Sequence, residues 1–368
     1  EFGKVVLVGD NAPRFDHDTT TRECKGLLLE ENRTNYVRVS TNMASEWQSG
    51  SGSVAVDNAI TNPDGSVGAW YHTGSEVYHQ NIDLSGASTN VITVSLWVKE
   101  RSGQSGVMGI QIYQQITGGA VDLNSFNFNP ATAAISTPDA NFSDGKVVEY
   151  PNGWYRISAK VTTDSGNFSS STRYDMQGAE HYVWGMQVEV GAFPTSFIPT
   201  NGSIATRGKD LAEIDGEEFT DFFNQDEGTI NCAYWLGDDN SGMRIFQIND
   251  SNNSVIDIIA GSGSGSGGYG YVNTGGVAQA NGGQSSTNAN YLNNLHVTTL
   301  AYKANDIAGI NRNTGVLTTD TSATLDGAYN RVTFYQGSTG GDQLNGHFQR
   351  VQYYPKRLPD NQLKNLNN

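Results

Sequence analysis

The chain has 368 residues, of which 36% are hydrophobic, 10% aromatic and only 16% charged, and its formal net charge is −16. This length fits about two domains of ~150–200 residues, and the aromatic content argues against disorder. The acidic balance disfavours phosphate backbones and anionic headgroups, and no apolar run approaches the ~18 residues of a membrane span. Nucleic acid and membrane insertion are therefore excluded as modes of action.

The first half of the chain has the pattern of short strands separated by turns. One run, residues 91–100, places four apolar side chains on a single face: Ile92, Val94, Leu96 and Val98. Similar runs, each bounded by Gly, Asn, Asp or Ser clusters, cover residues 106–116, 153–163 and 180–190. A period of two at such spacing predicts an all-β sandwich.

The run HYVWGMQVEVGAFPTSFIPT (181–200) closes this half. Its alternation is interrupted at Trp184 and Gly185, which predicts a β-bulge at Gly185. Pro194 and Pro199 cannot donate hydrogen bonds to a strand ladder, so we expect the strand to end before them.

The second half has the same character. Its expected strands cover residues 228–236, 244–250, 254–260, 294–303, 331–337 and 346–356. One short C-terminal helix is predicted over residues 357–366, because Pro359 suits a first helical turn and Leu363 and Leu366 share a face. The Gly-, Ser- and Asn-containing stretch between the halves suits an exposed connection. The predicted domains are therefore residues 1–200 and 217–368, joined by a linker at 201–216.

Several stretches resemble bacteriophage tail and virion structural proteins. RFDHDTTTRECKGLLLEENRTNYV (14–37) resembles the segment that opens many of them, and PNGWYRIS (151–158) with residues 181–200 resembles the later strands of their jelly-roll module. In the second half, residues 296–323 and 344–366 resemble their laminin-G-like, concanavalin-A-like sandwich. The resemblance implies two tandem jelly-roll sandwiches, the second concanavalin-A-like, and provides no catalytic residues to transfer.

The function implied by this resemblance is non-catalytic recognition of host-surface glycan by a phage virion or tail-fibre module. Its expected location is the virion surface, hence extracellular, and its expected partners are bacterial surface polysaccharide and other virion proteins. Phage fibres are often trimers, so a homotrimer is one expectation for the assembly. Two alternatives stay open: a polysaccharide-degrading glycoside hydrolase or its carbohydrate-binding module, and a ligand-free structural fibre or capsid-decoration protein.

A hydrolase would need catalytic carboxylates, and AEIDGEEF (212–219) supplies the candidates Glu213, Asp215 and Glu217. At positions i, i+2 and i+4 of a strand they share one face, and the run resembles the catalytic strand of concanavalin-A-like endoglucanases. Against this, Gly216 weakens a strand, the run lies at the domain junction, and the Trp-Pro-x-x-Gly lead-in of those enzymes is missing. We therefore predict no enzymatic activity and interpret the run as a solvated linker.

Aromatic side chains are the better indication of a binding site, because sugar rings stack on Trp or Tyr while polar side chains bond their hydroxyls. The tryptophans in apolar strands are expected in the core: Trp97, Trp154 and Trp184. The predicted carbohydrate-binding residues lie in or beside expected loops: Trp47, Trp70, Tyr71, His72, Tyr269 and Tyr271.

Metal and thiol chemistry have weaker support. No histidine or cysteine has the spacing of a zinc site, and no cofactor is predicted. A structural Ca²⁺ is a minor hypothesis, with Asp238 and Asp239 of GDDNSG as oxygen ligands. Cys24 and Cys232 lie in opposite halves and are expected to be two separate buried thiols.

Overall fold

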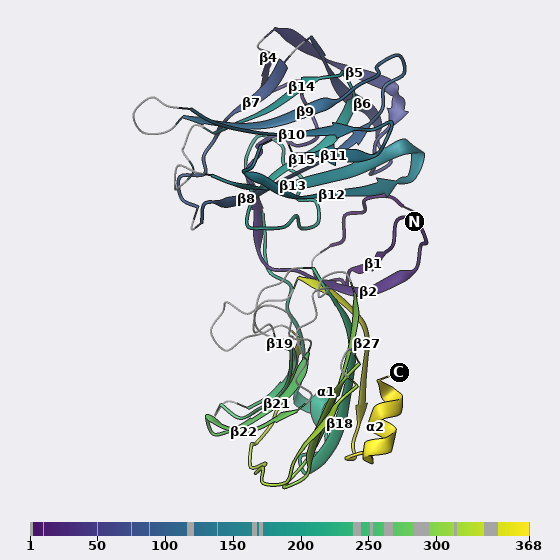
Figure 1. The fold of residues 1–368 in the computed structure, drawn as a ribbon, viewed down its shortest axis with the longest axis vertical. Helices are drawn as coiled ribbons and strands as arrows, with labels where there is room; N and C mark the ends of the chain where they lie inside the picture. The colour runs from purple at the N-terminus through teal and green to yellow at the C-terminus, as the bar shows by residue number, and fades with distance from the viewer. Residues whose placement is uncertain are drawn as a thin grey trace. The chain divides into compact units, whose positions relative to one another are not determined.

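In the computed structural model the chain is built mainly of antiparallel β-strands (Figure 1). The structure describes residues 3–367 except 10, 50, 75, 88, 116–120, 138, 164–167, 169–171, 238–243, 251–252, 261–267, 283–293, 313–314 and 335–344. The chain divides into two compact units: unit 1 comprises residues 1–9, 18–22 and 32–208, and unit 2 comprises residues 10–17, 23–31 and 209–368. Each unit is a jelly-roll-type β-sandwich, which confirms the predicted fold class.

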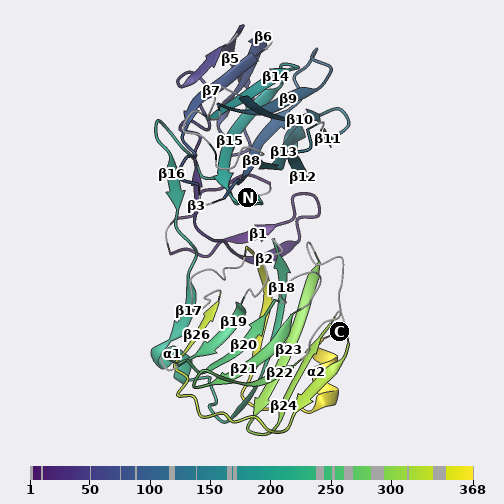
Figure 2. The same cartoon turned by 60° about the vertical axis from the view of Figure 1, so that its left-hand side comes forward.

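Unit 1 contains two six-stranded sheets and a short ribbon. The first, here called the β14 sheet, has the order β11 (Ala134–Ser136), β10 (Val121–Asn129), β9 (Met108–Gln115), β14 (Thr172–Gly178), β7 (Glu76–Ile82) and β4 (Trp47–Ser49). The second, the β8 sheet, has the order β12 (Phe142–Tyr150), β13 (Trp154–Thr162), β8 (Val91–Lys99), β15 (Tyr182–Val190), β6 (Val67–Gly74) and β5 (Gly52–Thr61). The ribbon pairs β3 (Arg33–Asn35) with β16 (Ala205–Arg207), as Figure 2 shows.

Unit 2 also contains two sheets. The β18 sheet has the order β1 (Phe15–His17), β2 (Cys24–Leu29), β27 (Gly346–Tyr354), β18 (Glu227–Leu236), β23 (Leu295–Lys303), β24 (Ile307–Asn311) and β25 (Leu317–Asp320). The β20 sheet has the order β17 (Ala212–Asp215), β26 (Arg331–Phe334), β19 (Arg244–Asn249), β20 (Val255–Ile259), β21 (Tyr269–Thr274) and β22 (Val277–Gly282).

The N-terminal strands β1 and β2 belong to unit 2, although the sequence analysis placed residues 1–200 in one domain. Leu27 and Leu28 of β2 pair with Phe348 and His347 of β27, more than 300 residues away along the chain. The 201–216 segment also differs from an exposed linker, since β16 lies within it and β17 joins the β20 sheet beside β26.

Alternating side chains explain why the unit 1 sheets pack face to face. All four apolar residues expected on one face of residues 91–100 are fully buried in a single cluster, together with the inward side chains of β9 and β14. Trp97, Trp154 and Trp184 are buried as predicted, in a second cluster on the other side of the β8 sheet. The predicted bulge is also present, because the β15–β8 register shifts between Trp184 and Gln187, and β15 ends before Pro194.

Two α-helices complete unit 2. The predicted C-terminal helix is α2 (Asp360–Leu366), whose Leu363 is buried against Ala301, Ala308 and Ile310 of the β18 sheet. A second helix, α1 (Gly216–Thr220), was not expected. Within the described residues, no helix is long and apolar enough to cross a membrane.

Candidate functional site

Trp47, predicted to bind carbohydrate from a loop, lies instead in strand β4. Its indole is buried, and Nε1 donates a hydrogen bond to the Val39 carbonyl at 3.0 Å. The ring packs edge-on against Tyr174, with the two centroids 5.8 Å apart. The loop prediction was therefore wrong, because this indole fills part of the unit 1 core and does not present a face to a sugar.

The predicted trio Trp70, Tyr71 and His72 lies on strand β6 and does not form one surface. Alternation along the strand turns Trp70 toward the unit 1 core and Tyr71 to the opposite face, where the Arg101 guanidinium lies 4.1 Å from its ring centroid. His72 is fully buried, and burial lowers the pKa of its imidazole, so it is neutral at pH 7. Only Tyr71 of the three is placed at an outer face.

Tyr269 and Tyr271 lie on β21 and point away from the unit 2 core, because the intervening and following residues face it. The cross-strand partner of Tyr271 is Asp257, which forms an ion pair with Arg244 and has an exposure of 0%. Burial raises the pKa of the Asp257 carboxyl to about 7, although the Arg244 guanidinium opposes this shift. Two predicted residues thus share a face with a buried ion pair that sequence patterns did not indicate.

The three candidate carboxylates do not share a strand face. Glu213 and Asp215 are exposed on one side of β17, but the chain turns at Gly216, whose φ is +60°, and Glu217 lies in the first turn of α1. The strand that the hydrolase alternative requires therefore ends at Asp215 and does not include Glu217. Asp215 and Glu217 instead line a surface groove of about 540 Å³ together with Arg331.

Asp238 and Asp239, the predicted calcium ligands, lie outside the described residues. Within the described ranges no three His, Cys, Asp or Glu side chains gather as a metal-binding group would require. Cys232 is buried as expected, which raises the pKa of its thiol, whereas Cys24 is exposed at the start of β2. The expectation of two buried thiols was wrong for Cys24, because the strand begins with that side chain turned to solvent.

A more complete site lies on the outer face of the β14 sheet. Met108, Ile110 and Ile112 of β9 are buried in the core, so Gln111 and Tyr113 between and after them point outward. The same alternation turns three residues of β14 outward, while Tyr174 and Met176 are buried: Arg173, Asp175 and Gln177. We call the surface formed by Tyr78, Gln111, Tyr113, Arg173, Asp175 and Gln177 the tyrosine–arginine face.

An ion pair forms the centre of this face. Arg173 donates through Nε to Oδ1 of Asp175 at 2.9 Å and through Nη2 to Oδ2 at 2.7 Å, so the guanidinium binds the carboxylate in a bidentate manner. The rings of Tyr78 and Tyr113 lie 4.3 and 4.5 Å from the guanidinium carbon. These contacts leave the Asp175 side chain 0% exposed while Arg173 stays 23% exposed, so the group is held rigidly at an open surface.

The strand register extends this centre into a row of polar groups. Tyr78 pairs with Gln48 on one side and Asp175 on the other, and Asp175 in turn pairs with Gln111, which pairs with Ser125. Gln177 Nε2 donates to Gln111 Oε1 at 2.5 Å. Five adjacent strands therefore present amide, hydroxyl and guanidinium groups around two aromatic rings.

Such a surface is chemically suited to a polar ligand with flat apolar faces. The tyrosines supply apolar area with little rotamer freedom to lose, and the glutamines and Arg173 supply hydrogen bonds in fixed positions. Among the described side chains of this face the one carboxylate is that of Asp175, which is covered by its ion pair. The arrangement has the groups that bind a saccharide.

The sequence prediction of binding residues does not include this face, because it selects aromatic residues in or beside expected loops and this face lies on strands. The available signal was the outward register of QIY (111–113) and of TRYDMQ (172–177), in which polar and aromatic side chains alternate with buried ones. What the sequence could not supply was that β9, β14 and β7 are neighbours, since the residues that bring Tyr78 and Tyr113 to Arg173 are far apart in the chain.

The described site and fold together are a β-sandwich with a polar and aromatic sheet face. No protein-family model matches the chain, and no curated protein matches it. Among solved structures, the CBM22-1 xylan-binding domain from Paenibacillus barcinonensis is similar over 45% of this chain and 97% of its own, with 12% identity and a TM-score of 0.28.

Two longer structures are similar over most of the chain. The CBM22-1–CBM22-2 tandem domain from the same bacterium covers 89% of this chain and 98% of its own, with 10% identity and a TM-score of 0.29. The mouse laminin α1 chain, domains LG4-5, covers 87% and 94%, with 10% identity and a TM-score of 0.30. TM-scores this low indicate no specific relationship, so the function has to be inferred from the chain's own residues.

Proposed function

We propose that this chain is a non-catalytic glycan-binding protein whose ligand lies on the tyrosine–arginine face. The observation that carries the proposal is the Arg173–Asp175 ion pair enclosed by Tyr78 and Tyr113 at an accessible sheet face. A purely structural ion pair would not need two tyrosines and two hydrogen-bonded glutamines around it. Those groups are the ones that a carbohydrate site combines.

The finer proposal is that this recognition serves a bacteriophage virion or tail fibre at the surface of its bacterial host. It rests on the resemblance of residues 14–37 and 181–200 to phage virion proteins, and on the fit of a rigid sheet-face site to an extended surface polysaccharide. Under this proposal the chain works outside the cell, next to other virion proteins, with a homotrimer as the assembly to test.

Replacing Tyr113 with Ala is expected to weaken glycan binding about tenfold, because a stacked ring contributes on the order of 1 kcal/mol or more. Binding of the full chain is screened on an array of bacterial surface polysaccharides, and the best ligand is then titrated by calorimetry. Tyr113→Phe should retain most of the affinity, since it keeps the ring.

Tyr71→Ala is the matched control, because Tyr71 also covers an arginine, Arg101, but from strand β6. It should leave glycan affinity unchanged. Absence of binding to every polysaccharide tested would favour the ligand-free structural role instead. Equal losses in the Tyr113 and Tyr71 variants would place the ligand elsewhere.

A hydrolase remains the second candidate because Asp215 and Glu217 line one groove with Arg331. The test is the appearance of new reducing ends when the chain is incubated with β-glucans or host capsule. Under the binding proposal none appear. Activity that is lost in Glu217→Gln would instead establish the enzyme.

A further inference from the structure

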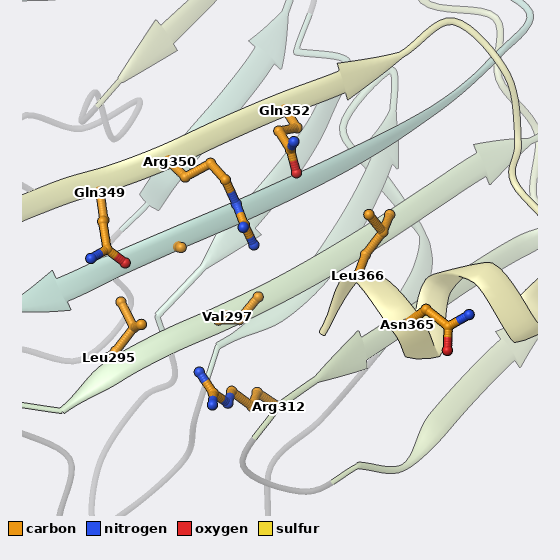
Figure 3. A pocket seen from close by; sticks show the side chains of 9 residues that line it. Leu295, Val297, Arg312, Gln349, Arg350, Gln352, Asn365 and Leu366 are labelled. Carbon is orange, nitrogen blue, oxygen red and sulfur yellow. The ribbon is translucent and has the colours of Figure 1, made fainter. Parts of the chain in front are cut away.

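A second surface, on the outer face of the β18 sheet in unit 2, forms a groove of about 340 Å³ (Figure 3). This volume lies at the lower end of the ~300–1,000 Å³ of small-molecule sites. Its floor is apolar and consists of Ala233, Leu295, Val297 and Leu366. Two arginines, two glutamines and one asparagine provide the polar walls: Arg312, Arg350, Gln349, Gln352 and Asn365.

Strand register explains why this face is hollow. Arg350 of β27 pairs with Ala233 of β18, Ala233 pairs with Val297 of β23, and the Arg312 amide donates to the Val297 carbonyl at 2.9 Å. The row therefore has an arginine at each end and two small side chains between them. Three interstrand steps of about 4.8 Å place the arginine backbones about 14 Å apart. Figure 3 shows Arg350 and Arg312 on opposite sides of Val297.

The groove is held in shape by a buried amide beneath it. Asn231 has an exposure of 0%; its Oδ1 accepts a hydrogen bond from Arg350 Nη2 at 3.1 Å. Its Nδ2 donates to Thr299 Oγ1 at 2.7 Å and to the Leu366 carbonyl at 3.4 Å. One side chain thus orients the guanidinium of Arg350 and ties down the end of helix α2 that forms the opposite wall. This preorganisation lowers the entropic cost of binding.

The charge of the groove is unusual for this chain. Within the described residues, neither Arg312 nor Arg350 has a carboxylate within ion-pair distance, whereas three other arginines of unit 2 do: Arg14, Arg244 and Arg357. The formal net charge of the whole chain is −16. Two guanidiniums left without a carboxylate on one groove in so acidic a protein are positioned to receive an anion from outside.

We propose that this groove binds an acidic saccharide, with a carboxylate or sulfate group between Arg312 and Arg350. The apolar floor contacts a face of the sugar ring, and Gln349, Gln352 and Asn365 bond its hydroxyls. This goes beyond the proposed function, because the site lies in unit 2, selects for charge and does not depend on the tyrosine–arginine face. A nucleic acid is a poorer ligand, since the acidic chain repels a phosphate backbone.

The test titrates the full chain with a galacturonate trisaccharide, a sulfated galactose trisaccharide and the neutral galactose trisaccharide. Arg312→Gln is expected to weaken binding of an acidic probe about tenfold or more, because a bidentate charged contact is lost, and to change binding of the neutral probe little. The affinity of Arg312→Lys for the acidic probe should lie between that of the unchanged chain and that of Arg312→Gln. Comparison of the carboxylated and sulfated probes identifies which anion is preferred.

Lys356→Gln is the control, because it also removes one positive charge from unit 2, at an exposed position that does not line the groove. It should leave binding of the acidic probe unchanged, and so should Tyr113→Ala. Equal binding of acidic and neutral probes, or an unchanged affinity in both Arg312→Gln and Arg350→Gln, would overturn the proposal. Loss of binding in Tyr113→Ala alone would assign the ligand to unit 1 instead.

Discussion

Replacing Arg244 with Met is expected to destabilise unit 2 by about 3–5 kcal/mol above pH 7, because it leaves the carboxylate of Asp257 buried without its counter-charge, and by less below pH 7, where that carboxyl is protonated. Asp257 has an exposure of 0%, and its ion-pair partner Arg244 reaches it from the neighbouring strand β19. Hydrogen exchange of the amides in β19 and β20 measures the lost stability of unit 2, and denaturant unfolding of the whole chain is a second measurement of it.

Two further variants separate the lost charge from lost packing. The double variant Arg244→Met with Asp257→Asn removes both charges and should recover most of the stability lost in the single variant. Arg331→Met, in the same sheet but without a buried carboxylate, should change stability by less than ~0.5 kcal/mol. If the double variant were as unstable as Arg244→Met, the buried charge would not be the cause.

The Asp257 carboxyl also makes the stability of unit 2 depend on pH. Burial raises the pKa of the Asp257 carboxyl to about 7, well above its ordinary range, so the folded state binds this proton more tightly than the unfolded state. The stabilisation from that proton is complete below the unfolded pKa and is lost as the pH rises from about 4 to about 7. Asp257→Asn should remove this component of the pH profile, and Arg244→Met should extend the window to higher pH.

Local sequence patterns were sufficient for the strands and for the core side chains. The alternation of Ile92, Val94, Leu96 and Val98 specified which face of β8 is buried, since only one register removes all four from water. The proline and leucine spacing at the C-terminus was equally informative about α2. These features depend on residues close together in the chain, where period and turn chemistry act directly.

Strand neighbours were not predictable in the same way. Nothing in residues 24–29 indicates that they pair with β27, because a pairing between strands so far apart in the chain is set by sheet geometry and not by local composition. The aromatic signal failed for a related reason. Trp47, predicted in a loop, lies in the core, while Tyr113, which is not among the predicted binding residues, lies on the tyrosine–arginine face. Which side of a sandwich an aromatic residue occupies depends on the partner strand.

The carboxylate run shows how one backbone angle decides a site. Glu213 and Asp215 follow the strand pattern, but the φ of +60° at Gly216 places Glu217 on helix α1, so the three carboxylates no longer share one strand face. A motif defined by spacing alone assumes a continuous strand. A glycine within the run is the sequence feature that warns against that assumption.

Replacing Gly185 with Ala is expected to destabilise unit 1 by about 2–5 kcal/mol, from a left-handed backbone and a steric clash together. Gly185 lies at the bulge of β15 with φ +63°. A Cβ at this position would lie 2.8 Å from Cε3 and 2.9 Å from Cζ3 of Trp97, whose indole is 1% exposed and packs edge-on against Trp184 and Phe197. The indole cannot move away without opening that cluster.

Gly216→Ala is the control that isolates the backbone component, because Gly216 has nearly the same φ, +60°, and nothing within 4 Å of its Cβ position. Gly216→Ala should destabilise unit 2 by about 1–2 kcal/mol.

Two measurements report on the two units separately. Tryptophan fluorescence during denaturant unfolding reports on unit 1, which contains five of the six tryptophans, and hydrogen exchange in β17 and β26 reports on Gly216→Ala. Equal costs for the two alanines would contradict the clash. In a Trp97→Leu background the cost of Gly185→Ala should fall toward that of Gly216→Ala, since the atoms it would strike are gone.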